Sequence, residues 1–338
     1  VRLFSRKARL RIERARLFIW NCETSGISRR SKGNVFTFHA GAALFSQLYF
    51  PNGVAVTANN HVFDGYEEGA LSLMNMLHEN AIPHNGLHIR HRYSPLLTTP
   101  WARPDIYLMA GSPMSQIGGG PRIVTLNYPA LLEEVGLLRS REPAAIIIVY
   151  AHDGLEHQDV PTLRQEQWAR LFARAGADVV LFAHNHRYGR FQILEDTPRK
   201  TFVAWSLGNF LFGGNRQWRC RDDVRLLSLR LDPDSGEKEG RWLHGTTRDW
   251  EFSFLEEGGA SWRRRRAAAE GTARCSGTAA KRSFLFSLGL SKVTRPTLRE
   301  NAVFFFGVGR ASALASSRGD HVLNVNPIRR IADGVWRL

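Results

Sequence analysis

The sequence has little cysteine and no long apolar run, and each absence excludes a class of protein. Its 338 residues include three cysteines, Cys22, Cys220 and Cys275, which lie far apart and show no CxxC spacing. This spacing indicates neither a disulfide framework nor a cysteine-rich zinc site. No apolar run approaches the roughly 20 residues of a membrane-spanning helix. The first twenty residues show no secretory signal, because they lack an apolar core and a small-residue cleavage site.

Acidic residues are scarce at both ends of the sequence, and this accounts for its formal net charge of +15. Residues 1–20 carry a net charge of +6 and residues 259–338 carry +11, whereas residues 21–258 carry −2. The arginine run at 263–266 could contact an anionic surface or RNA, but such a run is more often a solvated, flexible cluster. Because the excess of positive charge is confined to the ends, the composition argues against a nucleic-acid-binding protein.

Short apolar runs alternate with helical patterns along most of the chain. The runs lack the strict alternation of a half-exposed strand, so they favour strands that are buried on both faces. They occupy residues 15–20, 54–58, 145–151, 178–183 and 201–206. Between or after them lie predicted helices at 67–81, 128–140 and 163–177, and a predicted hairpin at 225–245. Strands that alternate with helices predict an α/β layered fold.

The composition and the periodicity of the sequence change near residue 258. Beyond this point Gly, Ala, Ser and Arg dominate and periodicity is weak, and residues 301–309 form an isolated apolar run. We therefore expect a basic leader over 1–15, a folded domain over 16–258 and a basic extension over 259–338.

Residue types that bind metals follow four of the apolar runs. In an open α/β sheet the carboxyl ends of the strands form the crevice where ligands bind, so these clusters can meet in space. Imidazole nitrogens mixed with carboxylate and amide oxygens suit Zn²⁺, Mn²⁺ or Fe and disfavour Ca²⁺. The residues concerned are Glu23, Asn60, His61, Asp64, His152, His184 and His186.

Each of these residues has a simpler interpretation when it is taken alone. A single histidine at a strand end is more often structural, and neighbouring asparagines are usual in turns. The coincidence of four clusters favours a shared metal site. His184 and His186 could both project from an irregular turn toward one or two ions, because alternate residues of an extended backbone share a side. The remaining histidines are expected to be structural or on the surface: His78, His84, His88, His91 and His157.

The same motifs resemble those of the CapA family, bacterial capsule-synthesis proteins associated with poly-γ-glutamate. The similarity extends over about residues 16–245. The matching segments are NCE (21–23) for the family's NLE, ANNHVFD (58–64) for ANNHxxD, HDGLEH (152–157) for HWGxEY, ADVVLFAHNH (177–186) for GADxVxGHHPH, and WSLGNFLF (205–212) for YSLGNFxF.

This resemblance implies a calcineurin-like metallophosphoesterase fold, which is a layered β-sandwich flanked by helices, with two divalent ions (Mn, Fe or Zn) at the strand ends. It implies that His61 is a general acid or transition-state donor and that Asp64 orients its ring. Two ions would polarise a phosphoryl oxygen and lower the pKa of a bound water. The implied ligands are Glu23, as the bridging carboxylate, with Asn60, His152, His184 and His186.

Two departures from the family pattern affect these expectations. The family opens with a strand that ends in Gly-Asp, whose aspartate is a first metal ligand, and a helix follows before NLE, but no aspartate precedes Asn21 here. Either the sequence starts late, or the chain lacks its first strand and helix and one ligand. Such a loss would weaken metal binding and leave a central strand unpaired. In addition, Ala183 stands where the family has a histidine.

We therefore expect a capsule or poly-γ-glutamate biosynthesis protein with a metal-dependent phosphoesterase-type site. Its substrate would be a phosphoester or a poly-γ-glutamate-related molecule, and its partners would be capsule-synthesis proteins. Two alternatives stay open: an impaired scaffold or polyanion-binding protein of the same fold, and a plain metallophosphatase acting on another phosphoester. The resemblance implies the cell envelope, but the sequence has no segment that settles the location or the activity.

Overall fold

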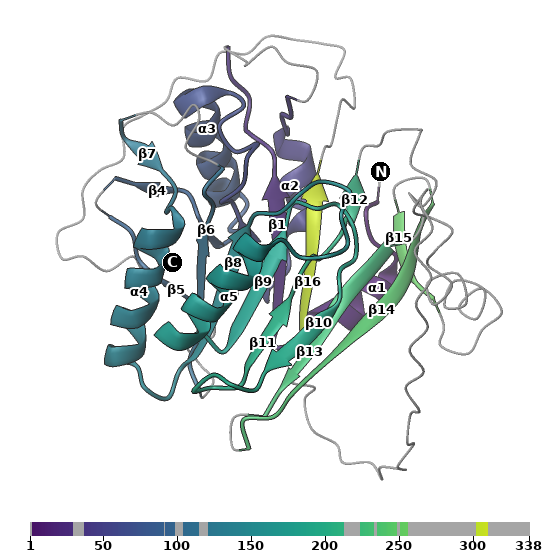
Figure 1. Cartoon of the computed structure of the whole chain (residues 1–338). Helices are drawn as coiled ribbons and strands as arrows, with labels where there is room; N and C mark the ends of the chain where they lie inside the picture. The colour runs from purple at the N-terminus through teal and green to yellow at the C-terminus, as the bar shows by residue number, and fades with distance from the viewer. Residues whose placement is uncertain are drawn as a thin grey trace.

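The structure is a computed structural model that describes residues 2–29, 37–90, 92–98, 104–114, 121–212, 224–232, 235–248, 251–255 and 302–309. In these residues, helices cover the outer sides of two main β-sheets (Figure 1). The predicted α/β class is confirmed. Cys220, Cys275, His91 and the arginine run at 263–266 lie outside the described residues.

The larger sheet has eight strands and mixes parallel with antiparallel pairs. Its order is β15-β14-β13-β16-β1-β2-β3, and β12 pairs with β16 outside this order. β1 is parallel to both of its neighbours, whereas β13, β14 and β15 form an antiparallel meander. The strands are β1 (Leu17–Glu23), β2 (Gly53–Val56), β3 (His84–Asn85), β12 (Leu211–Phe212), β13 (Val224–Leu231), β14 (Lys238–Arg248), β15 (Glu251–Phe254) and β16 (Ala302–Gly309).

The smaller sheet has six strands in the order β10-β11-β9-β8-β6-β5. Its four central strands are parallel, and an antiparallel strand closes each edge. The strands are β5 (Leu96–Leu97), β6 (Ile106–Gly111), β8 (Ile146–His152), β9 (Val179–Ala183), β10 (Phe191–Leu194) and β11 (Thr201–Ala204). A separate two-stranded ribbon joins β4 (His88–Ile89) to β7 (Ile123–Val124).

The helices pack on the outer faces of the two sheets. They are α1 (Arg6–Glu13), α2 (Ala42–Leu48), α3 (Tyr66–Glu79), α4 (Tyr128–Arg141) and α5 (Leu163–Ala175). Local chemistry fixes the ends of α5: Thr162 and Gln165 form a reciprocal capping box, and Gly176 ends the helix with a φ of 114°. Among the described residues, no helix combines the length and the apolar character that crossing a bilayer requires.

Three apolar clusters show how the layers pack. One lies between the sheets and combines residues of β1, β2 and β13 with residues of β6, β8 and β9. The other two lie outside, one under α1, α2 and α3 and one under α4 and α5. In β8, Ile148 belongs to the inner cluster and its neighbours Ile147 and Val149 to an outer one. The strand is therefore buried on both faces, as its unbroken apolar sequence predicts.

Most predicted elements are confirmed. The five apolar runs became β1, β2, β8, β9 and β11, and the three helical patterns became α3, α4 and α5. The predicted hairpin is formed by β13 and β14. Sequence patterns did not reveal α1, whose helix lies within the expected basic leader, or β6, which occupies an interior position in the smaller sheet.

The expectation that a central strand is left unpaired is wrong. β16 lies beside β1 in parallel, with Leu17 opposite Val303 and Glu23 opposite Gly309, and its other side is antiparallel to β13. This strand comes from the expected extension over 259–338, most of which lies outside the described residues. An apolar run that is far from β1 in the sequence thus pairs with both β1 and β13 and lies between them in the sheet. The predicted domain boundaries themselves stay a prediction.

Candidate metal centre

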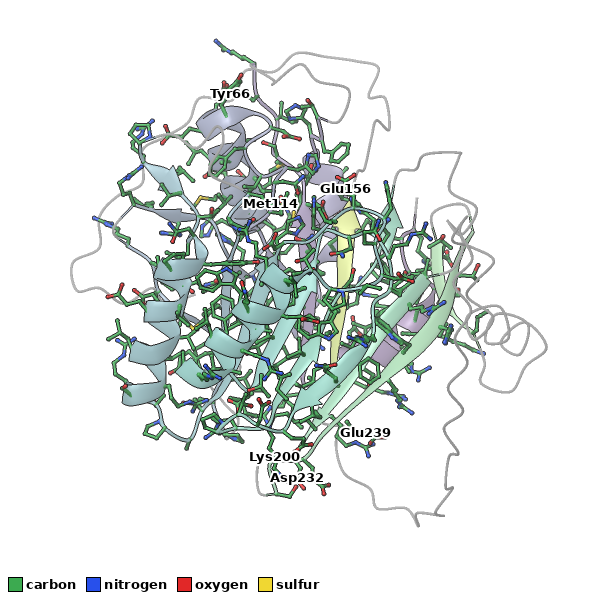
Figure 2. All side chains as sticks on the ribbon, in the orientation of Figure 1. Tyr66, Met114, Glu156, Lys200, Asp232 and Glu239 are labelled. Carbon is green, nitrogen blue, oxygen red and sulfur yellow. The ribbon has the colours of Figure 1, made fainter. Side chains whose placement is uncertain are left out.

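Three strand ends from the two sheets meet at one end of the molecule. Glu23 is the last residue of β1, His152 is the last residue of β8, and His184 directly follows β9. Parallel strands have their carboxyl ends at the same end of a sheet. The packing of the two sheets brings these ends close together. Glu156 marks this end in Figure 2, whereas Lys200 marks the opposite end.

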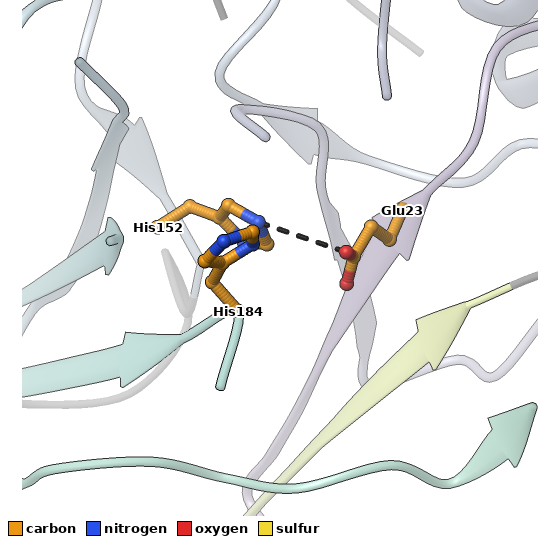
Figure 3. A group of neighbouring side chains, drawn as sticks. All are labelled: Glu23, His152 and His184. Carbon is orange, nitrogen blue, oxygen red and sulfur yellow. Dashed lines mark ion pairs between the residues drawn. The ribbon is translucent and has the colours of Figure 1, made fainter. Parts of the chain in front are cut away.

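Glu23, His152 and His184 form a buried cluster. One potential ligand atom of each lies within 4.8 Å of the others, and Glu23 Oε1 is 3.7 Å from His152 Nε2. Figure 3 shows the carboxylate on one side of the cluster and the two imidazole rings on the other. Three buried atoms of the cluster, Glu23 Oε1, His152 Nδ1 and His184 Nδ1, have no hydrogen-bond partner in the described part of the chain. Such buried polar atoms usually have a partner, and this donor set fits a divalent ion.

The two neighbouring asparagines after β2 have different contacts. Asn60 Oδ1 accepts a hydrogen bond from His152 Nε2 at 2.8 Å, so it reaches the same imidazole nitrogen that faces Glu23. Asn59 instead holds the turn: its Nδ2 donates to Cys22 O at 2.8 Å, and its Oδ1 accepts from the His61 backbone N–H at 3.1 Å. Asn60 is therefore the asparagine that is placed to bind an ion.

His186 approaches the same oxygen of Glu23 as His152 does. Its Nε2 is 4.0 Å from Glu23 Oε1, and its Nδ1 donates to Asn209 Oδ1 at 2.8 Å. It does not join the group formed by Glu23, His152 and His184. A histidine whose second nitrogen is held in this way has a fixed ring orientation and tautomer. Asn209 belongs to the SLGNF segment, which the sequence indicated only as a rim.

The turn that carries both histidines has an unusual backbone. His184 has a φ of 108° and His186 a φ of 57°, values that are uncommon for residues other than glycine. Two backbone hydrogen bonds, from Asp153 N to Ala183 O and from His157 N to Asn185 O, connect the turn to the loop after β8. The irregular turn that the sequence predicts is present, although its backbone at the two histidines is not extended. The turn is left-handed, and such outliers cluster at functional sites.

His61 is held by a carboxylate at the edge of the cluster. Asp64 Oδ2 accepts from His61 Nδ1 and from the Phe38 backbone N–H, both at 2.8 Å. The ring centroids of Phe38 and His61 are 4.1 Å apart. These contacts fix the ring with Nδ1 as the donor, so Nε2 is the nitrogen that is able to exchange a proton with another molecule.

Burial sets the charge states of the cluster. Removal from water raises the pKa of Glu23, and the electrostatic influence of His186 and His61 opposes this change. Burial lowers the pKa of His184 to about 4 and brings the pKa of His152 well below its ordinary range, an effect that the neighbouring histidines reinforce. The imidazoles of His152 and His184 are thus neutral, which is the form that binds metals. A bound cation would compensate the negative charge of the buried Glu23 carboxylate.

Two polar contacts around the cluster were not found from the sequence. Asn21 Nδ2 donates to Glu23 Oε2 at 2.9 Å, and Ser112 Oγ donates to His152 O at 2.9 Å. Asn21 lies within β1 and Ser112 follows β6, and no local spacing indicates either contact. The structure thus brings five predicted ligands to one strand-end region, and their binding of metal stays a prediction: Glu23, Asn60, His152, His184 and His186.

A cavity of about 340 Å³ lies at the opposite end of the molecule, where Lys200 and Asp232 are labelled in Figure 2. Its buried carboxylate, Asp178, is already paired, because it accepts from Arg139 Nη2 and Arg199 Nε at 2.7 Å each. The Asp178 carboxylate is therefore satisfied by two arginines within the protein.

Comparisons with known proteins agree with these motifs. The family described as "Bacterial capsule synthesis protein PGA_cap" matches residues 2–214. The capsule biosynthesis protein CapA of Bacillus anthracis is 29% identical over 115 residues, which cover 33% of this chain and 26% of the relative. The PGA biosynthesis protein CapA of Bacillus subtilis (strain 168) is 32% identical over 92 residues, which cover 27% and 23%. The chain spans about a quarter of the length of these relatives. Because the family match covers more than half of the 338 residues, the chain belongs to the bacterial capsule synthesis protein family PGA_cap.

Proposed function

We propose that this chain is a CapA-type capsule or poly-γ-glutamate biosynthesis protein with a metal-dependent phosphoesterase site. The observation that carries the proposal is the buried cluster of Glu23, His152 and His184 at the meeting point of two sheets. Two sheets with an apolar layer between them and helices outside also suit the calcineurin-like fold that the CapA resemblance implies.

The side chains of this region can each take one part in a hydrolysis. A divalent ion held by Glu23 and the imidazoles would polarise a phosphoryl oxygen and acidify a water molecule. His61 would give a proton to the leaving oxygen from Nε2, because Asp64 already holds its Nδ1. Asp64 thereby acts as the positioning residue for His61.

The substrate class follows from the proposed chemistry and from the relatives. A phosphoester, or a molecule related to poly-γ-glutamate, would be bound at the strand ends, and capsule-synthesis proteins would be the partners. Both curated relatives carry capsule or PGA biosynthesis in their names.

The test combines metal analysis with turnover of two substrates by the full chain. After incubation with Mn²⁺ and removal of excess metal, we expect bound ion by mass spectrometry and hydrolysis of bis(p-nitrophenyl) phosphate. A parallel assay follows cleavage of poly-γ-glutamate by gel filtration. His184→Ala should abolish the hydrolysis, whereas His78→Ala, a control on the exposed surface of α3, should not change it.

Two results would contradict the proposal. A folded protein that binds no ion would remove the metal site. Bound ion without turnover of either substrate would favour the scaffold or polyanion-binding alternative, in which His184→Ala has no functional effect.

A further inference from the structure

We propose that Asn185 is a positioning residue for the candidate metal centre: its side chain connects the turn that carries His184 to the loop after β8, and this connection holds the imidazole of His184 beside that of His152. The inference rests on the proposed function, because it concerns the same site. It deepens that function by adding a residue that acts on the metal ligands through the backbone instead of binding the ion.

The Asn185 side chain is buried and is hydrogen-bonded to the loop. Its Nδ2 donates to Gln158 O at 3.0 Å, and its backbone carbonyl accepts from His157 N at 2.8 Å. A third hydrogen bond runs from Asp153 N to Ala183 O at 3.1 Å. Three hydrogen bonds thus connect the turn to the loop, and Asn185 takes part in two of them.

Gly154 gives the Asn185 amide its place against the loop. The φ of Gly154 is 139°, and a Cβ there would lie 2.2 Å from Asn185 Oδ1 and 3.0 Å from its Nδ2. The amide therefore lies directly against the Gly154 Cα, a close approach that only glycine permits. Gln165 Nε2 of α5 donates to Asp153 O at 3.0 Å. The amide thus contacts a segment that α5 holds in place.

The backbone of the turn depends on these contacts. His184 has a φ of 108° and His186 a φ of 57°. Residues with a side chain persist in such conformations only where surrounding contacts hold them. Two of the three hydrogen bonds join backbone atoms and would form with any residue at position 185. Only the bond from Nδ2 to Gln158 O requires the asparagine side chain.

The connected segments carry the two imidazoles of the cluster. His152 directly precedes the loop, and His184 directly precedes Asn185. The ring centroids of the two histidines are 5.1 Å apart, and both residues belong to the group whose potential ligand atoms lie within 4.8 Å of one another. Removing a contact that orients metal ligands typically lowers metal affinity by roughly 10- to 100-fold. Loss of the Asn185 contact should therefore weaken metal binding although every ligand remains.

The first experiment compares variants of the metal-free full chain. Asn185→Ala removes the amide, and Asn185→Asp keeps its shape but replaces the donor by an acceptor. Gln158→Ala is the matched control, because Gln158 contributes only its backbone carbonyl to this contact and its side chain is exposed. We expect the imidazole ¹⁵N NMR signals of His184 to change in both Asn185 variants and to match the wild type in Gln158→Ala. Circular dichroism checks that each variant folds.

The second experiment measures Mn²⁺ binding by calorimetric titration and records the absorption spectrum of the Co²⁺-loaded protein, which reports the arrangement of the ligands. Both Asn185 variants should bind Mn²⁺ at least tenfold more weakly, and their Co²⁺ spectra should differ from that of the wild type. Gln158→Ala should bind Mn²⁺ within twofold of the wild type. A merely structural role would lower the unfolding temperature of the Asn185 variants and leave affinity and spectrum unchanged, and this result would overturn the inference.

These measurements separate the inference from the proposed function. Wild-type turnover, with unchanged His184 signals and unchanged affinity in the Asn185 variants, would overturn the inference and leave the proposed function intact. Changed signals and affinity without wild-type turnover would overturn the hydrolysis and leave the role of Asn185 standing. A wild type that binds no ion would overturn the metal site, and the imidazole signals of the metal-free chain would still decide whether Asn185 holds His184.

Discussion

The two sheets contribute different halves of the candidate metal centre. The smaller sheet supplies nitrogen: His152 ends β8 and His184 follows β9. The larger sheet supplies oxygen: Glu23 ends β1 and Asn60 follows β2. The nitrogen half is built from consecutive elements, β8, α5 and β9. The oxygen half depends on β16, which comes from residues 302–309. One half is thus local in sequence, and the other needs a contact between distant segments.

The largest effect should come from breaking the strand on which the oxygen half depends. Phe305 of β16 pairs with Ile19 on one side and Leu227 on the other. Phe305→Pro removes a backbone donor from a central strand and should lower the free energy of unfolding by roughly 3 kcal/mol or more. Urea denaturation measures this change. Phe305→Val keeps the donor and is the control. Equal midpoints for the proline variant and the wild type would show that β16 does not support the sheet.

The nitrogen half should be the more sensitive to acid. In metal-free protein, burial lowers the pKa of His184 to about 4 from its ordinary 6.5, so the unfolded chain binds its proton more readily. Stability is therefore fully present above pH 6.5 and is lost as the pH falls towards 4. The difference corresponds to roughly 3 kcal/mol for His184. Thermal unfolding with a chelator should show this loss, and His184→Gln should reduce the slope. A slope that is unchanged in His184→Gln would assign the acid sensitivity to other groups.

A smaller effect on stability should come from a substitution in the loop after β8, which is hydrogen-bonded to the turn that carries His184 and His186. Gly154 has a φ of 139°, and a Cβ there would lie 2.2 Å from Asn185 Oδ1. Gly154→Ala should cost about 2 kcal/mol in unfolding free energy, because this conformation is essentially restricted to glycine. It should also weaken metal binding by displacing His184. Calorimetric titration with Mn²⁺ tests this, with Gly136→Ala, at a helix position where a Cβ meets nothing within 4 Å, as control.

The smallest effect on stability should come from removing the negative charge of Glu23 in the oxygen half. Glu23 is buried and burial raises its pKa, so its negative charge destabilises the folded protein when no cation is bound. Glu23→Gln keeps the shape and the contact with Asn21, and should leave metal-free stability unchanged or raise it by about 1 kcal/mol. Differential scanning calorimetry measures it. A clear loss of metal-free stability would mean that the Glu23 charge already has a stabilising partner in the protein.

The sequence predicted which residues gather at the strand ends better than it predicted their geometry. Apolar runs followed by Glu23, His152 and His184 identified strand ends, because the residues after a buried parallel strand lie at the ligand-binding edge. The left-handed φ values of His184 and His186 were not predictable, since they result from hydrogen bonds with the loop after β8. The contact of Asn209 with His186 was missed for the same reason, because it joins segments that no local pattern connects.

The sequence by itself determined the α/β class, the buried strands and the chemistry of the side chains at their ends, because periodicity and residue type act locally. Only the tertiary structure decided that residues 302–309 lie beside β1 and that Glu23, His152 and His184 form one buried group. Strand pairing and ligand convergence depend on contacts between segments far apart in the chain. Such contacts form only when the apolar faces of both sheets pack together, and no local pattern encodes which distant strand fills a given slot.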